Sequence, residues 1–161
     1  MDSDAAEHQR FLAEAIAVAV AGVTDGQCGP FGAVVVKDGT IIARGHNQVV
    51  ATNDPTAHAE LVAIRAACRV LGTFQLEGCA VYASCEPCPM CFGALYWARP
   101  RAVYWAATRD DAAAAGFDDA FVYAELALPP EARRLEMRRV AVADAGRPFA
   151  AWLALASRVP Y

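Results

Sequence analysis

The sequence predicts an α/β protein built in three layers, in which helices cover both faces of one mixed five-stranded sheet. Two observations indicate this fold. First, β-branched runs and helical apolar repeats follow the order β-β-α-β-α-β, and parallel neighbouring strands need helical crossovers that lie on the faces of a sheet. Second, the chain has 161 residues, 57% of them hydrophobic and 20% charged, which fits one globular domain over residues 1–161.

The chain is predicted to open with a helix followed by a hairpin. Within residues 4–23, apolar side chains recur at helical spacing. Two β-branched runs follow, at 33–37 and 40–44. They flank Asp38-Gly39, a dipeptide typical of two-residue hairpin turns, so we expect an antiparallel pair of strands here.

A second helix and two further strands, separated by a third helix, come next. Residues 57–71 repeat apolar positions at helical spacing, and the pattern ends at Gly72, a residue type that often terminates helices. We expect a strand at 79–83, a helix beginning near Cys88 and a strand at 102–106. These elements complete the β-β-α-β-α-β order.

The rest of the chain carries shorter signals. They predict, in order, a short helix around 109–115, a loop through 116–121, a break at Pro129-Pro130, a strand at 136–142 and a last helix near 148–157. The strand at 136–142 is the fifth strand of the predicted sheet.

Charge and hydropathy argue against nucleic-acid and membrane partners. The net charge is -4, and the 14 basic residues, all but one of them arginine, are scattered along the chain. Nucleic-acid binders usually carry a basic stripe, so no nucleic-acid partner is expected. The longest apolar run, 15–23, is too short to span a bilayer and follows acidic residues rather than basic ones. These features predict a cytoplasmic protein without a membrane partner.

The cysteines suggest a metal site. There are six, and three of them, Cys85, Cys88 and Cys91, lie close together. In the cytoplasm such clustering favours metal ligands over disulfides. Cys88 and Cys91 flank Pro89, which suits the first position of a helix. Both thiols then face the same side of the first helical turn, where the helix dipole stabilises thiolates.

His58 and Glu60 supply the other half of this predicted site, at the start of the helix expected over 57–71. Three protein ligands, His58, Cys88 and Cys91, with one open position form the pattern of a catalytic zinc site. Glu60 stands two residues from His58 and therefore points to another side of the helix. We expect it to line the adjoining cavity and to act as the general base that takes a proton from water.

A closed structural zinc site is the alternative. Cys85 as a fourth ligand would give a Cys3His set with no open position, which is typical of a non-catalytic zinc module. Cys85 is expected in the strand-to-helix loop, away from the face that the other two thiols share. The remaining Cys28, Cys68 and Cys79 are interpreted as small buried hydrophobic residues.

The motifs resemble those of a known family. His-Ala-Glu at 58–60 and Pro-Cys-Pro-Met-Cys at 87–91 match the His-x-Glu and Pro-Cys-x-x-Cys signature of the zinc nucleobase deaminases. GPFGAVVVKDG, NDPTAHAE, SCEPCPMC, GALYWARP and AGFDDAF resemble the bacterial guanine deaminases of the cytidine-deaminase-like fold, over essentially the whole chain. The resemblance implies that fold, one zinc ion, and the hydrolysis of guanine to xanthine and ammonia. It also implies Glu60 as the residue that shuttles protons.

The resemblance further implies substrate contacts. Asn47 matches the position that hydrogen-bonds the purine, and Asp119 matches an acidic contact. A carboxylate that accepts from the ring N-H and the exocyclic amine suits guanine better than cytosine or adenine. Asp118 cannot be separated from Asp119 by sequence alone. Phe31 and Trp97 are candidates for the apolar walls of the pocket, because bases are commonly gripped by aromatic faces.

A homodimer is implied as well. In the family, the C-terminal segment, here 145–161, is exchanged between two subunits, and its last residues close the partner's pocket. Tyr161 would then belong to the partner's site. This exchange is a form of domain swapping, and Pro129-Pro130 is the expected hinge.

Other substrates remain open at this point. The same chemistry would serve guanosine, an aminopterin, an amino-triazine or cytosine. The tRNA-adenosine deaminases share the DPTAHAE stretch but generally lack the Tyr-Trp-Ala-Arg-Pro and Gly-Phe-Asp-Asp stretches, and they need a basic surface. A pocket sealed by the C-terminal segment has no room for a ribose, which favours guanine itself.

Overall fold

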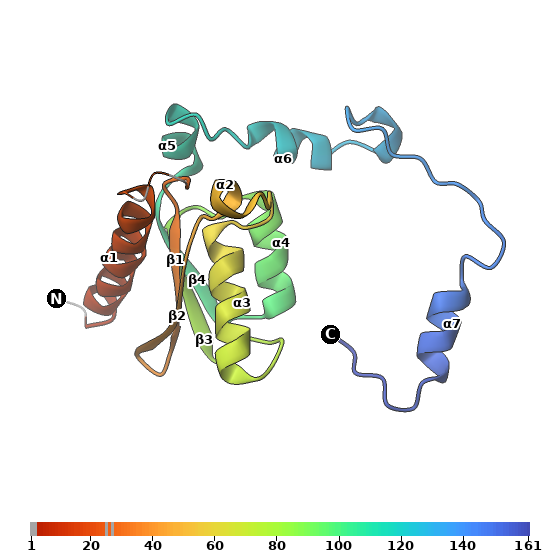
Figure 1. Ribbon diagram of the computed structural model, residues 1–161, viewed down its shortest axis with the longest axis horizontal. Coiled ribbons are helices and arrows are strands. Elements are labelled where there is room, and N and C mark those ends of the chain that lie inside the picture. The colour runs from red at the N-terminus through yellow and green to blue at the C-terminus, as the bar shows by residue number, and fades with distance from the viewer. Residues whose placement is uncertain (1–2, 25, 27) are drawn as a thin grey trace. The chain divides into compact units, whose positions relative to one another are not determined.

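The computed structural model describes residues 3–24, 26 and 28–161, and the chain divides into two compact units, Met1–Asp119 and Ala120–Tyr161 (Figure 1). We call them unit 1 and unit 2 and describe each by itself. Unit 1 contains α1 (Ser3–Thr24), β1 (Gly32–Lys37), β2 (Thr40–His46), α2 (Val49–Thr52), α3 (Ala59–Leu71), β3 (Cys79–Cys85), α4 (Pro89–Ala98), β4 (Ala102–Ala107) and α5 (Arg109–Ala114). Unit 2 contains α6 (Ala120–Leu126), the 3-10 helix η1 (Pro130–Ala132) and α7 (Arg147–Ala154).

Unit 1 is built on one mixed sheet with the strand order β2-β1-β3-β4. β1 runs antiparallel to β2 and β3, and β3 runs parallel to β4. The predicted hairpin is confirmed: Asp38 and Gly39 have φ angles of 48° and 71°, the left-handed values that a type I′ turn needs at both central positions. The register of the hairpin shifts between Val35 and Val36, which is a β-bulge and strengthens the local twist.

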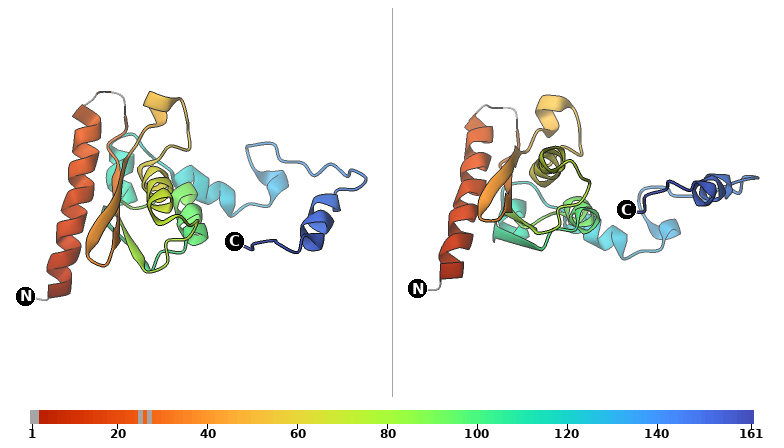
Figure 2. Two further views of the ribbon diagram at one scale, coloured as in Figure 1. Left: turned by 60° about the horizontal axis from the view of Figure 1, so that its bottom comes forward. Right: turned by 90° about the horizontal axis from the view of Figure 1, so that it is seen from below.

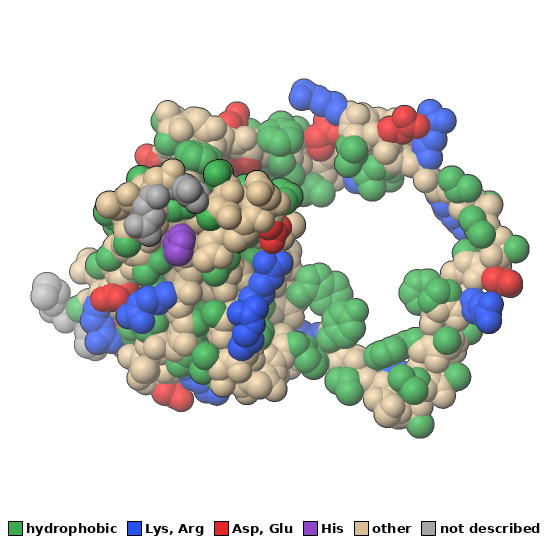
Figure 3. All heavy atoms as spheres, in the orientation of Figure 1, with side chains coloured by type: hydrophobic (Ala, Val, Ile, Leu, Met, Phe, Trp, Pro, Cys, Tyr) green, Lys and Arg blue, Asp and Glu red, His purple; other side chains and the backbone are tan. Residues whose placement is uncertain are grey.

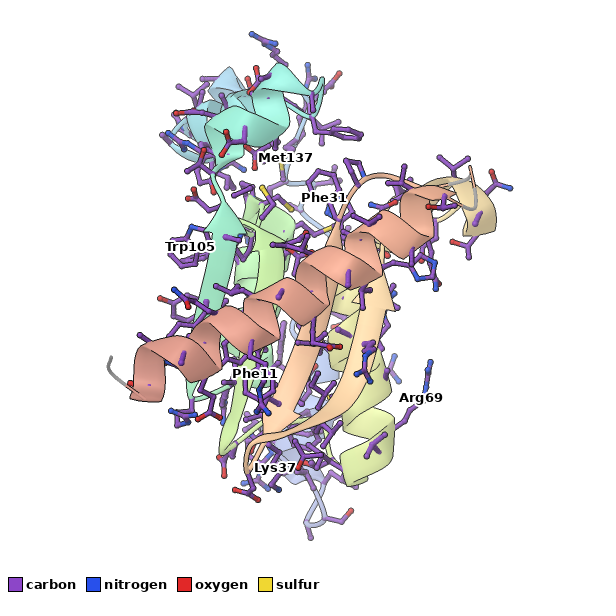
Figure 4. The ribbon with its side chains drawn as sticks, turned by 90° about the vertical axis from the view of Figure 1, so that its left-hand side faces the viewer. Phe11, Phe31, Lys37, Arg69, Trp105 and Met137 are labelled. Atoms are coloured by element: carbon purple, nitrogen blue, oxygen red, sulfur yellow. The ribbon has the colours of Figure 1, made fainter. Side chains whose placement is uncertain are left out.

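Helices cover both faces of this sheet, as predicted (Figure 2). Successive residues of a strand point to opposite faces. On one face Val34 and Tyr82 pack with Phe11 of α1, and Figure 4 shows α1 crossing the strands there. On the other face Val35 packs in a cluster with Ala63 of α3. Each face therefore has its own apolar contact layer.

Two glycines allow α1 and α3 to lie unusually close to the strands. A Cβ atom at Gly32 would be 2.3 Å from the carbonyl oxygen of Ala15 in α1. At Gly45 it would be 2.4 Å from the carbonyl oxygen of Ala59, the first residue of α3. Both distances are far shorter than a van der Waals contact, so only glycine permits this packing. Gly45 thus sets how closely the start of α3 approaches the sheet.

The described residues form four strands rather than the predicted five. Residues 136–142, the predicted fifth strand, lie in unit 2 outside any helix or strand. A strand needs a neighbour to satisfy its backbone groups, and β-branched residues alone do not supply one. The sequence also gave no sign of α2, and α6 begins at Ala120, inside the predicted loop 116–121.

Unit 2 has no hydrophobic core of its own, because none of its residues is buried. Figure 3 shows hydrophobic side chains on its surface. The large exposed ones include Phe121, Leu126, Leu128, Leu135, Met137, Val140, Val142, Phe149, Trp152, Leu153, Leu155, Val159 and Tyr161. Among the described residues, no helix of either unit is both long enough and apolar enough to span a membrane.

Candidate active site

The first turns of α3 and α4 bring the predicted ligands together. His58 is the N-cap residue of α3, and Cys88 is the N-cap residue of α4. Pro89 lies in the first turn of α4 as predicted, where its missing N-H leaves no hydrogen bond unmade. Because α3 and α4 contact each other, side chains that are 30 residues apart in the chain meet at these two helix starts.

His58, Cys88 and Cys91 converge on one point. Their ligand atoms all lie within 4.8 Å of one another. His58 Nδ1 is 3.4 Å from Cys88 Sγ and 3.6 Å from Cys91 Sγ. Tetrahedral zinc, at its usual bond lengths, holds a nitrogen and a sulfur ligand about 3.6 Å apart. The three side chains therefore form a zinc-binding site, and a set of three protein ligands leaves one coordination position open.

The two thiols differ in how readily they ionise. The hydrogen bond from Cys91 lowers the pKa of the Cys88 thiol to about 4, although burial opposes this shift. The same hydrogen bond, together with burial, raises the pKa of Cys91. The hydrogen bond with Cys88 also raises the pKa of His58. A divalent zinc ion brings positive charge that stabilises both sulfurs as thiolates and the imidazole in its neutral form.

Glu60 lies beside these ligands in a nearly closed environment. It is 7% exposed, and its Oε2 accepts a hydrogen bond from Cys91 Sγ at 3.4 Å. Burial raises the pKa of its carboxyl group, because desolvation disfavours the charged form. A buried carboxyl group with a raised pKa next to a catalytic metal site is suited to take up and release a proton.

Cys85 does not join the cluster, which among the residues that the structure describes consists of His58, Cys88 and Cys91. The sequence predicted Cys85 in the loop after the strand, but it is the last residue of β3. Its Sγ donates a hydrogen bond to the carbonyl oxygen of Thr108 at 3.3 Å. A closed Cys3His site is therefore not formed.

A short turn ahead of α3 holds His58 in place. Asp54 Oδ1 accepts hydrogen bonds from the backbone N-H of Thr56 at 2.8 Å and from its hydroxyl group at 2.7 Å. These bonds lower the pKa of Asp54. The backbone N-H of Gln48 donates to the carbonyl oxygen of Ala57 at 2.9 Å, which ties the end of the turn to the residues after β2.

Asn47 follows β2 directly and is 6% exposed. Its Oδ1 accepts hydrogen bonds from the backbone N-H groups of Gly29 at 3.3 Å and Val49 at 3.2 Å. The oxygen therefore serves the turn, which is the structural role that asparagine commonly has. The side-chain NH2 group is the end that remains for a ligand.

Phe31 precedes β1, and Figure 4 shows it at the opposite end of that strand from Lys37. Its ring meets the ring of Phe117 edge to face, with centroids 5.0 Å apart and planes at 87°, a favourable arrangement for aromatic pairs. Sequence analysis missed Phe117, although it lies in the AGFDDAF stretch, because nothing in the sequence shows which residue it contacts.

Asp119 is a better candidate for the acidic contact than Asp118. Burial raises the pKa of the Asp119 carboxyl group, and the negative charge of Cys88 raises it further. Asp118 is exposed, whereas Asp119 is half-buried.

The two other predicted substrate contacts, Trp97 and Tyr161, are exposed side chains. Trp97 is 64% exposed near the end of α4. It lies nine positions after Cys88, which corresponds to about 13 Å along the helix axis. Its role as a pocket wall stays a prediction. Tyr161 is the last residue of unit 2 and is 72% exposed.

Ser84 is a further support that sequence analysis missed. It is buried at the end of β3. Its Oγ accepts a hydrogen bond from the backbone N-H of Gly32 at 3.0 Å. This bond fastens the start of β1, next to Phe31, to the end of β3, which leads to Cys88.

Comparisons with known proteins agree with this geometry. Residues 5–107 match the family described as the cytidine and deoxycytidylate deaminase zinc-binding region. Over 154 residues the chain is 54% identical to a guanine deaminase of Bacillus subtilis (strain 168), a match that covers 96% of this chain and 99% of that protein. The X-ray structure of a guanine deaminase from Bacillus subtilis superposes with a TM-score of 0.94 at 55% identity and covers 96% of this chain and 98% of that one.

Other similar proteins match a smaller part of the chain. A tRNA-specific adenosine deaminase of Aquifex aeolicus is 54% identical over 70 residues, which are 44% of this chain and 46% of that protein. A solved structure in complex with 2,6-diaminopurine has a TM-score of 0.65 at 36% identity and covers 68% of this chain and 61% of that one. The chain thus belongs to the cytidine and deoxycytidylate deaminase zinc-binding family and, within it, to the guanine deaminases.

Proposed function

We propose that this protein hydrolyses guanine to xanthine and ammonia in a zinc-dependent reaction. The observation that carries the proposal is the meeting of three zinc ligands, His58, Cys88 and Cys91, with one buried carboxyl group, Glu60. The match to a guanine deaminase over nearly the full length of both chains supports guanine as the substrate.

The reaction divides between the metal and Glu60. Zinc, when bound, supplies the Lewis acidity that makes water nucleophilic near neutral pH. Glu60 accepts one proton from this water and delivers it to a ring nitrogen, and it then takes the second proton from the hydroxyl group added to the ring carbon and delivers it to the amine, which leaves as ammonia. Its burial supports this role, because a raised pKa lets the carboxyl group hold the proton between the two transfers.

Asn47 and Asp119 orient the base in this proposal. Asn47 presents a donor, because its oxygen is held by two backbone N-H groups. Asp119 presents an acceptor for the ring N-H and exocyclic amine of guanine. Phe31, held by Phe117, forms an apolar wall. A donor and an acceptor on two sides of one apolar pocket recognise a specific edge of a base.

The proposed enzyme is a homodimer with one deaminase domain per chain, residues 1–161, in which 145–161 cross to the partner. Support comes from the absence of buried residues in unit 2. Within α7, Phe149, Trp152 and Leu153 are exposed at a spacing that puts them on one helix face. Tyr161 then closes the partner's pocket. In the dimer we also expect residues 136–142 to find a neighbour and to add the fifth strand.

A cytoplasmic location is part of the proposal. All six cysteines are free thiols, and a reducing compartment keeps thiols in this state. Three of these thiols, among them the zinc ligand Cys88, are only half-buried. An oxidant could therefore reach Cys88, and its oxidation would destroy the zinc site.

The test is ammonia release by the zinc-loaded protein with guanine, guanosine, cytosine, cytidine, adenine and an amino-triazine. We expect the highest kcat/KM for guanine and little turnover of guanosine, because a sealed pocket leaves no room for ribose. A higher kcat/KM for guanosine or for another amino-heterocycle would overturn the assignment of substrate. Tight binding of tRNA at physiological salt would instead favour the editing class of deaminases.

A further inference from the structure

Gly29 lies where three side chains of the proposed substrate pocket meet, in the connection between α1 and β1. A Cβ atom at this position would be 3.3 Å from Phe31 Cδ2, 3.4 Å from Asn47 Cγ and 3.5 Å from Phe117 Cε1. These side chains come from three segments: the residues before β1, the end of β2 and the loop after α5. The space that glycine leaves empty is therefore shared by Asn47 and the aromatic pair.

Gly29 also fixes which end of the Asn47 side chain faces the pocket. The N-H of Gly29 and that of Val49 both donate to Asn47 Oδ1. Turning the amide over would set its NH2 group against two N-H donors, so this network allows one orientation. The NH2 group of Asn47 forms no hydrogen bond with any residue that the structure describes, and no fully buried side-chain nitrogen or oxygen lacks a partner there. It is therefore accessible to a ligand as a donor.

Backbone hydrogen bonds tie the same residues together. The N-H of Phe31 donates to the carbonyl oxygen of Gly29 at 2.9 Å, and the N-H of Asn47 donates to that of Phe31 at 3.0 Å. Gly29, Phe31 and Asn47 thus form one connected unit of main chain. If the Asn47 side chain is pushed away from Gly29, these hydrogen bonds hold the backbone of Asn47 in place, so the side chain moves alone.

The conformation of Gly29 does not by itself require glycine. The glycines with φ in the left-handed region are Gly26, Gly39, Gly72, Gly78 and Gly116, and Gly29 is not among them. Alanine at this position therefore adds one methyl group without backbone strain. What it changes is the space beside Asn47, Phe31 and Phe117.

We propose that Gly29 is a positioning residue for substrate recognition, which locks the Asn47 carboxamide with its NH2 group toward the base. This inference rests on the proposed function, since it assigns to Asn47 a contact with the purine. Gly29 itself touches no substrate. It acts through the orientation of Asn47 and through the space that it leaves.

The test is a double-mutant cycle with guanine as the substrate. Gly29→Ala is expected to raise KM roughly tenfold or more, the scale of one lost substrate hydrogen bond, with kcat within about threefold of wild type. In the Asn47→Ala background, Gly29→Ala should change KM by less than about twofold, because coupled residues are not additive. Effects that multiply, or an unchanged KM, would overturn the positioning role.

Zinc content and thermal unfolding separate this role from a structural one. Both are expected to stay near wild type in Gly29→Ala, whereas a merely structural glycine would lower the unfolding temperature and leave KM alone. Gly93→Ala is the matched control, because a Cβ atom there meets nothing within 4 Å. It should alter neither KM nor zinc content.

Asn47→Asp keeps the inference testable even if Gly29→Ala does not fold. This variant retains an oxygen for the N-H groups of Gly29 and Val49 but replaces the NH2 donor by an acceptor. We expect KM for guanine to rise roughly tenfold, and an unchanged KM would overturn the predicted orientation. Failure of the wild-type protein to deaminate guanine would instead count against the proposed function itself. That outcome is distinct from an unchanged KM in Gly29→Ala or in Asn47→Asp, which would count against the positioning role alone.

Discussion

Unit 1 and unit 2 are both rich in apolar side chains but use them differently. In unit 1, α1 and α3 pack on opposite faces of the sheet and bury two clusters of aliphatic and aromatic residues. In unit 2, α6 and α7 bury no residue at all. Burial of apolar surface is the main driving force of folding. Unit 1 therefore has an apolar core that stabilises the elements carrying its zinc site, whereas unit 2 has no such core to stabilise its own helices.

This difference suggests how the protein divides its tasks. The metal ligands and Glu60 lie at the starts of α3 and α4, and each of these helices has residues buried within unit 1. Unit 2 exposes apolar side chains that can be buried only against a surface outside the unit. A second copy of the chain is the partner that we propose, so chemistry would belong to unit 1 and closure of the pocket to unit 2. Four predictions test this division.

The largest effect is expected from losing a zinc ligand. Cys88→Ser should abolish both zinc binding and measurable deamination, because one of three protein ligands is removed. Cys85→Ser is the matched change at a thiol that bonds to Thr108 instead, and it should keep zinc. Metal analysis after dialysis against a chelator measures both. Loss of zinc from Cys85→Ser would contradict a three-ligand site.

Removing the proposed proton carrier should cost activity but not metal. Glu60→Ala is expected to lower kcat by roughly 10²- to 10⁴-fold, the usual contribution of general acid-base catalysis. Zinc content should remain, since Glu60 is not part of the converging ligand set. The measurement is steady-state ammonia release beside metal analysis. Near-normal turnover in this variant would show that another group moves the proton.

Deleting Tyr161 tests whether unit 2 completes a site. We expect kcat/KM for guanine to fall roughly tenfold or more, about the cost of one substrate contact, while zinc content stays unchanged.

Mixing two chains that each carry one defect shows which subunit that site belongs to. A Glu60→Ala chain with an intact C-terminus and a chain without Tyr161 should form heterodimers with one complete site. If Tyr161 acts on the partner, about a quarter of all sites would then regain activity after random exchange of subunits. No recovery in the exchanged mixture, with exchange verified by mass, would mean that Tyr161 acts on its own chain or on none.

Local signals made most of unit 1 predictable. Asp38-Gly39 predicted the hairpin turn, Gly72 the end of α3 and Pro89 the start of α4, and each is confirmed. Such residues act through their own φ angle or missing N-H, so no distant contact is needed to interpret them. The zinc ligands were predictable for a related reason, because each stands at the start of a helix that the sequence already indicated.

Features that depend on distant partners were not predictable. Residues 136–142 have the composition of a strand, but a strand also needs an edge to pair with, and no sequence pattern names one. The contacts between Gly29 and Asn47 join residues 18 positions apart, and only the fold brings them together. The role of Trp97 as a pocket wall stays a prediction, because it lies near the end of α4 and not at the helix start that carries Cys88.

The smallest expected effect compares a glycine in each unit. Gly45→Ala would put a methyl group 2.4 Å from the carbonyl oxygen of Ala59, and overpacking of this kind costs about 1–3 kcal/mol of unfolding free energy. Because the displaced element is the start of α3, zinc affinity should fall with it. Gly146→Ala in unit 2 meets nothing within 4 Å and should change stability by less than about 1 kcal/mol. Denaturant unfolding of both variants, each with zinc bound, gives the comparison. Equal stability of the two variants would show that α3 can shift without cost, and the tight packing assigned to unit 1 would then not be what holds His58 in place.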